Sequence, residues 1–304
     1  MLLGTELPLF SSITVISRIF LGPSMAMDLN GSGLTIDDVE SVARRGASVS
    51  VTDDGWARIE ECREMIQEKI DNHEIMYGVT TGIGEFSEVV LTPEQVKDFQ
   101  KYLIYSHAAG IGGPLPKDVV RGAMVGRINV HCHGNSGGRR EVTQQLIEMV
   151  NRGVTPVAAA KGSVGACGDL SPMSQVAMAM MGEGDVFYEG ERMEAATALS
   201  AAGLEPLKLH ARDGLAIING SNMLTSMAAL TLCDAERWVK LQDVAAAMTL
   251  EALNANMLPY DHRLHELRGF SGSQIVASNL RRLTEGSEIM AAQGKKVQDA
   301  YSLR

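Results

Sequence analysis

A long stretch without glycine in the last third of this 304-residue chain most constrains how it can fold. Residues 221–268 contain no glycine and a single proline, Pro259. A helix of about 30 residues over the first part of this stretch would be about 45 Å long. Apolar side chains recur at helical spacing along it, at Trp238, Leu241, Val244, Ala245 and Met248. Such a helix is typical of a bundle, because its apolar stripe must be buried against partners.

The rest of the chain predicts shorter elements, among which helices dominate. Apolar residues at helical spacing predict helices over residues 56–70, 93–108, 116–132, 139–152 and 173–181. Residues 34–39 suggest a short strand turning into a capped helix, and residues 187–193 suggest a small hairpin. The fold class is therefore mainly α. An N-terminal mixed globular part, residues 28–220, leads into a long-helix bundle that begins in residues 221–304.

Composition excludes several classes of protein. The chain is 45% hydrophobic and 21% charged, as expected of a soluble globular protein. Its formal net charge of −10 argues against nucleic acid or an anionic membrane as a partner. The cysteines are widely spaced and form no Cys-x-x-Cys pair, which favours a reducing cytoplasm over a disulfide framework. They are Cys62, Cys132, Cys167 and Cys233.

The first residues of the chain are apolar only in patches. The first charge is Glu6, Pro8 interrupts the run, and Arg18 falls inside it. This pattern differs from the basic start and unbroken apolar core of a signal peptide, and it is too broken for a membrane span. We interpret residues 1–27 as a disordered N-terminal extension.

Residues 162–172, Gly-Ser-Val-Gly-Ala-Cys-Gly-Asp-Leu-Ser-Pro, are the most informative chemically. Small neighbours would let the Gly168 nitrogen reach the carbonyl carbon of Ala166, an approach that a Cβ atom would hinder. Loss of water and of the Cys167 heteroatom would then leave an exocyclic alkene on an imidazolone ring. Such a ring is an electrophile that no ordinary side chain supplies.

The residues that follow predict the start of a helix. We expect Ser171 to be its N-cap and Pro172 its first residue. The electrophile would then lie near the positive end of a helix. The alternative interpretation is a glycine-rich turn before a helix, with a buried thiol.

Four segments together resemble the aromatic amino acid ammonia-lyase and aminomutase superfamily. Residues 162–172 are similar to its ring-forming segment, with Cys167 in place of serine. Residues 77–84, Tyr-Gly-Val-Thr-Thr-Gly-Ile-Gly, resemble its glycine-rich loop, and residues 219–221, Asn-Gly-Ser, its Asn-Gly-Thr. Residues 297–304, Val-Gln-Asp-Ala-Tyr-Ser-Leu-Arg, are similar to its Val-Gln-Asp-Pro-Tyr-Ser-Leu-Arg. The segments follow the family's order, and the resemblance runs from about residue 28 to the last residue.

The resemblance implies a methylidene-imidazolone group formed autocatalytically from Ala166, Cys167 and Gly168. In the family this group captures the substrate amine, so that a poor leaving group departs more readily. Elimination at Cys167 would release hydrogen sulfide where serine releases water. Tyr77 would be the general base that takes the β-proton of the substrate.

The resemblance also implies the residues that bind the substrate. Arg304 would pair with the substrate carboxylate as a two-pronged donor. Asn219 and Gln298 would hydrogen-bond the amine or the carbonyl oxygen of the ring. Tyr301 would line the site.

His107 is the clue to the substrate. It lies in residues 106–110, Ser-His-Ala-Ala-Gly, a frame found in histidine ammonia-lyases and similar to that of tyrosine aminomutases. Histidine here can hydrogen-bond an imidazole or a phenol. We expect a carbon–nitrogen lyase that removes ammonia from an aromatic L-amino acid, converting histidine to urocanate. Asn222 stands where histidine ammonia-lyases often have glutamine, so tyrosine ammonia-lyase or tyrosine 2,3-aminomutase remains an alternative, as does a non-catalytic fragment or homologue without the mature ring.

The resemblance further implies a homotetramer whose active sites draw residues from more than one subunit. Because family members continue past the motif at residues 297–304, we expect a chain truncated at its C-terminus. We expect no metal, since residues 131–133, His-Cys-His, lack a second ligand cluster. We expect no nucleotide, since residues 77–88 lack the lysine of a phosphate-binding loop.

Overall fold

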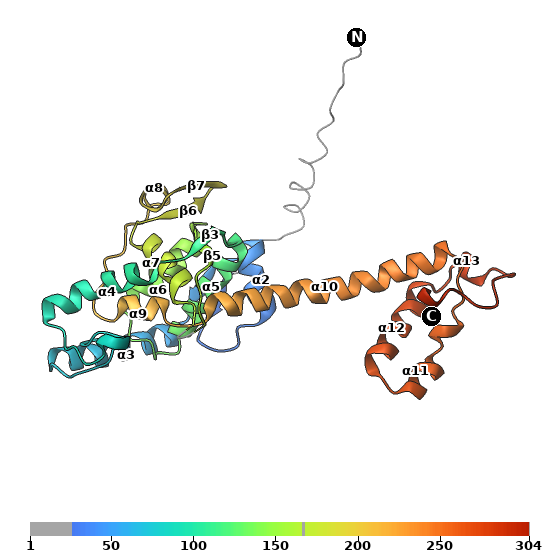
Figure 1. Cartoon of the computed structure of the whole chain (residues 1–304), viewed down its shortest axis with the longest axis horizontal. Coiled ribbons are helices and arrows are strands. Elements are labelled where there is room, and N and C mark those ends of the chain that lie inside the picture. Colours follow the sequence, from blue (N-terminus) through green and yellow to red (C-terminus); the bar gives the residue numbers. More distant parts are fainter. Residues whose placement is uncertain (1–25, 166–167, 304) are drawn as a thin grey trace, which may run out of the picture. The chain divides into compact units, whose positions relative to one another are not determined.

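The computed structural model of the chain describes residues 26–165 and 168–303. It divides into two compact units, the first ending at Leu230 and the second beginning at Thr231, which are described separately here (Figure 1). Three expected site residues, Ala166, Cys167 and Arg304, lie outside the described residues, as do residues 1–25 of the expected N-terminal extension.

The first unit is built mainly of helices, which confirms the expected class. Its elements are β1 (Met27–Leu29), α2 (Ile36–Arg45), β2 (Val49–Val51), α3 (Asp53–Asp71), η1 (Gly84–Phe86), α4 (Pro93–His107), β3 (Ile111–Pro114), α5 (Lys117–His131), α6 (Arg140–Asn151), β4 (Thr155–Pro156), β5 (Ala159–Lys161), α7 (Leu170–Met180), β6 (Asp185–Tyr188), β7 (Glu191–Glu194), α8 (Ala195–Ala201), α9 (Asp213–Ile218) and the start of α10 (Asn222–Ala252).

The described strands form three small sheets. β1 and β2 are parallel, β3 and β5 are antiparallel, and β4, β6 and β7 form an antiparallel sheet of three strands. β6 and β7 are the hairpin that the sequence predicts. None of these sheets is large enough to form a core of its own.

Helix α5 runs through the core of the first unit. It packs against α2 on one side and α6 on another, and Met124 and Ile128 on it are completely buried. The predicted apolar stripe on α7 is also confirmed as core packing, because Met173 and Met180 are completely buried. Figure 1 shows α4, α7 and α9 beside one another, and each of the three contacts the other two. These three helices position most of the candidate site.

The expected helix starts are partly right. The capped helix predicted over residues 34–39 is present, with Thr35 in a capping box with Asp38, but the strand of this region is β1, earlier in the chain. The prediction that Ser171 is the N-cap of α7 is wrong. The helix begins at Leu170 with Asp169 as N-cap residue, so Ser171 and Pro172 lie inside its first turn. The Asp169 carboxylate does not cap this helix, because it accepts a hydrogen bond from the backbone N–H of Leu224 at 2.9 Å.

The second unit contains the greater part of α10 and a cluster of shorter elements. They are η2 (Leu258–Tyr260), α11 (His262–Arg268), α12 (Ser271–Leu283), α13 (Glu288–Ala291) and η3 (Tyr301–Leu303). Its core is small, with Leu250 and Leu280 at the centre. The 31 residues of α10 confirm the long helix expected from the glycine-free stretch. Most of its apolar stripe is exposed in the single chain, with Trp238 at 64% and Met248 at 66%.

Candidate active site

Tyr77 lies on a loop between α3 and η1 that is fixed by its own backbone. The Met76 carbonyl accepts hydrogen bonds from the backbone N–H groups of Val79, Thr80 and Thr81. Tyr77 itself is 61% exposed, and its hydroxyl accepts a hydrogen bond from the Gly84 N–H at 3.2 Å. The phenol is therefore held on the surface of the first unit, accessible to a bound molecule.

Two positions of this loop, Gly78 and Gly82, need glycine because neighbouring atoms leave no space for a Cβ atom. Gly78 has a φ of +66°, and a Cβ atom there would lie 2.8 Å from the Cδ2 atom of Leu215 on α9. A Cβ atom at Gly82 would lie 2.6 Å from the backbone of Phe86. The loop that carries Tyr77 is thus packed directly onto α9, the helix that precedes Asn219.

His107 is the last residue of α4 and is half-buried. Its Nδ1 atom lies 2.9 Å from the carbonyl oxygen of Leu103 and 3.0 Å from Oγ of Ser106. A carbonyl oxygen can only accept, so Nδ1 donates and carries the ring proton. In the neutral imidazole, Nε2 is then an acceptor that suits a substrate N–H or O–H group.

Gly165 and Gly168 flank Ala166 and Cys167, from which the ring would form. The Gly168 N–H donates to the Gly165 carbonyl at 3.4 Å, across two intervening residues, and both glycines have positive φ angles, of +83° and +75°. Only glycine adopts such angles without strain. Gly165 and Gly168 are therefore held close together on either side of Ala166 and Cys167.

Gly168 also contacts the Asn-Gly-Ser segment that begins at Asn219. Gly168 and Gly220 form a parallel bridge, and the Asp169 N–H donates to the Gly220 carbonyl at 2.9 Å. A Cβ atom at Gly168 would lie 2.4 Å from the carbonyl carbon of Gly220. The structure thus brings together two segments more than 50 positions apart that the sequence predicts to belong to one site.

The segment that follows α4 also lies against the residues that precede Gly168. A Cβ atom at Gly162 would lie 3.0 Å from Cα of Gly110, which follows His107 closely, and 2.7 Å from Oγ of Ser171. The segment after His107, the segment before Gly168 and the first turn of α7 are therefore in contact.

Two basic residues of α5, Arg127 and His131, contact α9, the helix that leads to Asn219. Sequence patterns do not reveal this contact. Arg127 and His131 lie one helical turn apart, and both donate to the carbonyl of Ala216, at 3.3 and 3.0 Å. Burial, and then the Arg127 charge, lower the pKa of His131 to about 3, so its imidazole is neutral. Burial lowers the pKa of Arg127 to about 10, opposed by the Asp169 carboxylate, so its guanidinium remains charged at neutral pH. Sequence pattern alone marks His131 only as a candidate metal ligand, within residues 131–133.

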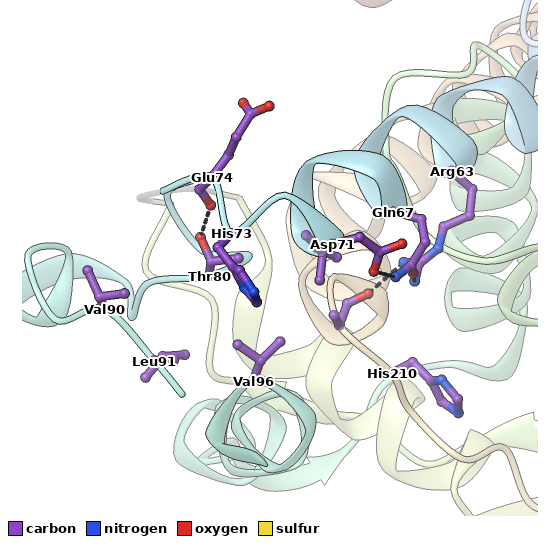
Figure 2. Close-up of a pocket in the computed structure, with 12 residues that line it drawn as sticks. Arg63, Gln67, Asp71, His73, Glu74, Thr80, Val90, Leu91, Val96 and His210 are labelled. Carbon is purple, nitrogen blue, oxygen red and sulfur yellow. Dashed lines mark hydrogen bonds between the residues drawn. The ribbon is translucent and has the colours of Figure 1, made fainter. Parts of the chain in front are cut away.

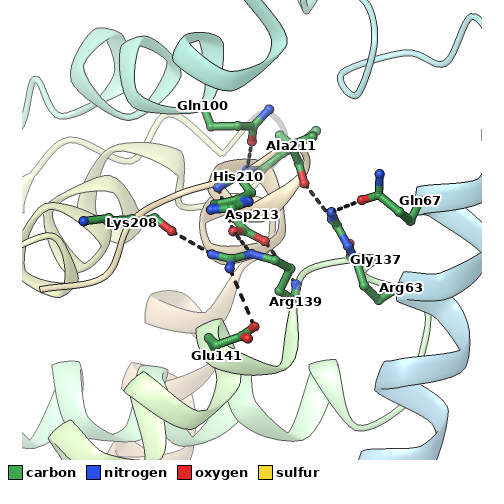
Figure 3. Close-up of polar contacts among 11 residues, drawn as sticks. Arg63, Gln67, Gln100, Gly137, Arg139, Glu141, Lys208, His210, Ala211 and Asp213 are labelled. Atoms are coloured by element: carbon green, nitrogen blue, oxygen red, sulfur yellow. Dashed lines mark hydrogen bonds and ion pairs between the residues drawn. The ribbon is translucent and has the colours of Figure 1, made fainter. Parts of the chain in front are cut away.

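A second buried network fixes the chain before α9 (Figure 3). Asp213 is completely buried, and its carboxylate accepts from the N–H and from Nε of Arg139 and from the N–H of His210, at 2.8–3.0 Å. Arg63 donates to the carbonyl of Ala211 at 2.7 Å. Gln100, also completely buried, accepts at 3.2 Å from the N–H of Leu215.

A pocket of about 610 Å³ lies beside the loop that carries Tyr77 (Figure 2). Its wall combines the end of α3, the loop residues Thr80, Val90 and Leu91, and His210. The Thr80 hydroxyl donates to the Glu74 carbonyl at 2.8 Å in this wall. Tyr77 and His107 do not line this pocket, whereas Asn219 lines another of about 420 Å³ together with Arg127.

The remaining expected site residues belong to the second unit. Tyr301 lies in η3 and is 83% exposed, and Gln298 is exposed on the segment before it. Within residues 26–165 and 168–303, no group of three His, Cys, Asp or Glu side chains could hold a metal ion. None of the helices in that part of the chain is long and apolar enough to cross a membrane.

The fold and the site thus define a mainly helical protein in which Gly168 is set against the Asn-Gly segment at residues 219–220. Comparison with known proteins identifies the family to which the chain belongs. The sequence profile of the family described as aromatic amino acid lyase matches residues 34–304. The chain is 43% identical to histidine ammonia-lyase of Alkaliphilus oremlandii over 277 aligned residues. The alignment covers 91% of this chain and 55% of that protein.

Solved structures agree with this match. Ergothionase from Treponema denticola, an ergothioneine-degrading enzyme, superimposes with a TM-score of 0.84 at 27% identity, over 91% of this chain and 56% of that one. Tyrosine aminomutase from Streptomyces globisporus does so with a TM-score of 0.83 at 30% identity, over 92% and 57%. The chain belongs to the aromatic amino acid lyase family and spans about half the length of the relatives it matches.

Proposed function

We propose that the full-length protein is a carbon–nitrogen lyase that removes ammonia from an aromatic L-amino acid, with histidine as substrate and urocanate as product. The observation that carries the proposal is the contact of Gly168 with Gly220, at a turn closed by Gly165. This arrangement suits a methylidene-imidazolone, because Gly168, which would supply a nitrogen of the ring, is held by its contacts with Gly165 and Gly220. The identity of 43% to a histidine ammonia-lyase supports the choice of reaction.

When present, the methylidene-imidazolone supplies a carbon electrophile that captures the substrate amine. We assign the other roles to side chains of this chain. Tyr77, exposed on its loop, would accept the β-proton, and His107 would accept a hydrogen bond from the substrate side chain at Nε2. Asn219, Gln298 and Tyr301 would bind the substrate, and Arg304 would pair with its carboxylate.

The intact mass of the purified chain tests this proposal. Closure of the ring from Ala166, Cys167 and Gly168 removes one water and one hydrogen sulfide. Cys167→Ser should lose two waters instead, and Cys167→Ala should lose no hydrogen sulfide and abolish turnover. Equal turnover of histidine by the wild-type protein and Cys167→Ala would refute the electrophile. A wild-type chain that keeps its encoded mass would favour the non-catalytic alternative.

A tyrosine ammonia-lyase or tyrosine 2,3-aminomutase is the second candidate. The tyrosine aminomutase with a TM-score of 0.83 supports it, and an Nε2 acceptor on His107 suits a phenol as well as an imidazole. Absorbance assays with histidine and tyrosine distinguish the two, since the products are urocanate and coumarate. A β-amino acid product would identify an aminomutase.

We also propose that the protein assembles as a homotetramer in the cytoplasm. The exposed apolar stripe on α10, including Trp238, Leu241 and Met248, supports assembly, because apolar surface of this extent gains stability when a partner covers it. Leu241→Glu with Met248→Glu should reduce the assembled mass measured by light scattering. Lys240→Glu changes an exposed residue on the same helix and serves as the control. A monomeric wild-type protein at micromolar concentration would contradict assembly.

A further inference from the structure

The pocket of about 420 Å³ that Asn219 lines has a basic wall. Arg127 on α5 and Arg212, just before α9, contribute two guanidinium groups to it, and Asn135 and Ser136 contribute an amide and a hydroxyl. None of the nine described residues that line the pocket is Asp or Glu. Pockets of this size take small molecules, whose orientation a few polar groups fix. The lining therefore favours an anionic ligand.

Arg127 is the buried cation of this wall. It is 2% exposed, and its Nη1 atom donates to the Ala216 carbonyl at 3.3 Å. Its Nε and Nη2 atoms have no hydrogen-bond partner within residues 26–165 and 168–303. Burying a guanidinium costs free energy unless its charge and its donors are satisfied. An anion in the pocket that Arg127 lines would offset this cost.

Arg212 is the second cation, and its backbone holds it in place. Its φ is +76°, in the left-handed region that residues other than glycine rarely adopt. Its Nε atom donates to the Ser136 carbonyl at 2.8 Å, which is the only hydrogen bond of this side chain to a described residue. Arg212 is thereby fixed in the pocket wall, with its two Nη atoms left to donate to a ligand.

The charge of this wall is only partly balanced within the chain. Burial lowers the pKa of Arg127 by more than the Asp169 carboxylate raises it, and Asp169 does not line the pocket. Burial is also the main cause that lowers the pKa of Arg212. Both guanidinium groups stay charged at neutral pH. A phosphate group carries a charge of about −1.5 to −2 at pH 7 and accepts two parallel hydrogen bonds from arginine, so it matches two guanidinium groups better than a carboxylate does.

We propose that the pocket lined by Arg127 and Arg212 binds the phosphate group of a small metabolite. Asn135, which is exposed, would donate a further hydrogen bond from its amide. The pocket is larger than a single phosphate group, which leaves room for an organic part of the ligand. Of the described residues expected at the active site, only Asn219 lines this pocket, so the inference does not rest on the proposed function.

Calorimetric titration of the purified chain with inorganic phosphate tests this site, with sodium chloride keeping the ionic strength constant. We expect saturable binding to the wild-type chain, and binding of acetate that is weaker by about tenfold or more, because acetate carries a single charge. Arg212→Met removes one guanidinium and should weaken phosphate binding by about tenfold or more. Asn135→Asp changes an exposed residue, so it serves where Arg212→Met does not fold, and its added negative charge should weaken phosphate binding to a similar extent.

Two matched controls lie outside the pocket. Arg121 on the same helix is also largely buried, but it donates to the carbonyls of Val42 and Val150, both at 3.1 Å, so Arg121→Met should bind phosphate with wild-type affinity. Asn72→Asp adds the same charge as Asn135→Asp at an exposed residue after α3, and it should also leave binding unchanged. A wild-type chain without saturable phosphate binding, or wild-type affinity in either folded pocket variant, would overturn the site. Acetate bound as tightly as phosphate would overturn the choice of a phosphate group.

Discussion

Gly168 and Gly220 face each other backbone to backbone, and a Cβ atom at Gly168 would lie 2.4 Å from the carbonyl carbon of Gly220. Gly168 precedes α7, and Gly220 separates α9 from α10. Their contact joins two segments that are similar to separate motifs of the family. The geometry of the candidate site therefore depends on two glycines as much as on any side chain that performs chemistry.

Alanine at either glycine should damage both stability and ring formation. Gly168→Ala places a Cβ atom 2.4 Å from the Gly220 backbone at a φ of +83°. Gly220→Ala places one 2.1 Å from Nη2 of Arg127. We expect each to reduce the free energy of unfolding by about 2–4 kcal/mol and to suppress the mass loss of ring closure. Urea unfolding and intact mass provide the two measurements.

Gly113→Ala is the matched control for these variants. Gly113 has open space around its Cβ position and lies in β3 of the same unit. It should unfold within about 0.5 kcal/mol of the wild type. If Gly168→Ala were as stable as Gly113→Ala and matured normally, the close approach of Gly168 to Gly220 would not matter for the site.

The buried ion pair of Asp213 with Arg139 should be essential for stability. Asp213→Asn removes the charge that balances Arg139 while preserving the size of the side chain. Because the guanidinium is largely buried and would keep only its longer pair with Glu141, at 3.8 Å, we expect a loss of about 3–5 kcal/mol in the free energy of unfolding. Asp185→Asn breaks an exposed pair with Arg192 and should cost below about 1 kcal/mol. Similar losses in the two variants would show that burial does not decide the contribution of the pair.

His131 should make stability depend on pH in the acid range. Its folded-state pKa, about 3, lies below the ordinary value of 6.5, so the unfolded chain binds a proton that the folded chain does not. Its contribution is fully present above about pH 6.5 and falls by up to about 1.4 kcal/mol per unit as pH drops toward 3. His131→Gln should therefore show a flatter dependence of unfolding free energy on pH between about 6.5 and 4. Parallel curves for the two proteins would contradict a neutral buried His131.

His107 should decide which substrate is used. Nδ1 donates to the Leu103 carbonyl, so Nε2 is the atom left to accept a hydrogen bond from the substrate. Losing one partner of such a bond costs about 1–3 kcal/mol. His107→Phe in the full-length protein should lower kcat/KM for histidine relative to phenylalanine by about 10–100-fold. His73→Phe, a substitution on the loop after α3, is the control and should leave the preference unchanged. An unchanged preference in His107→Phe would make His107 a packing residue.

Local sequence determined most of the helices. The Thr35 capping box starts α2 because its hydrogen bonds lie within four residues, and the absence of glycine over residues 221–268 permits the 31 residues of α10. The four family-like segments could also be recognised from the sequence, since each depends on short spacing. The roles of their residues remain predictions.

Tertiary structure decided the features that depend on distant partners. Helix α7 begins at Leu170 and not after Ser171, and the Asp169 carboxylate just before it accepts a hydrogen bond from the backbone of Leu224, 55 positions away. Asp213 meets Arg139 across 74 positions, and Arg127 meets Ala216 across 89, so no local pattern could reveal these contacts. A short-range pattern specifies turns and caps, whereas the cost of burying a charge is decided only when the whole unit folds around it.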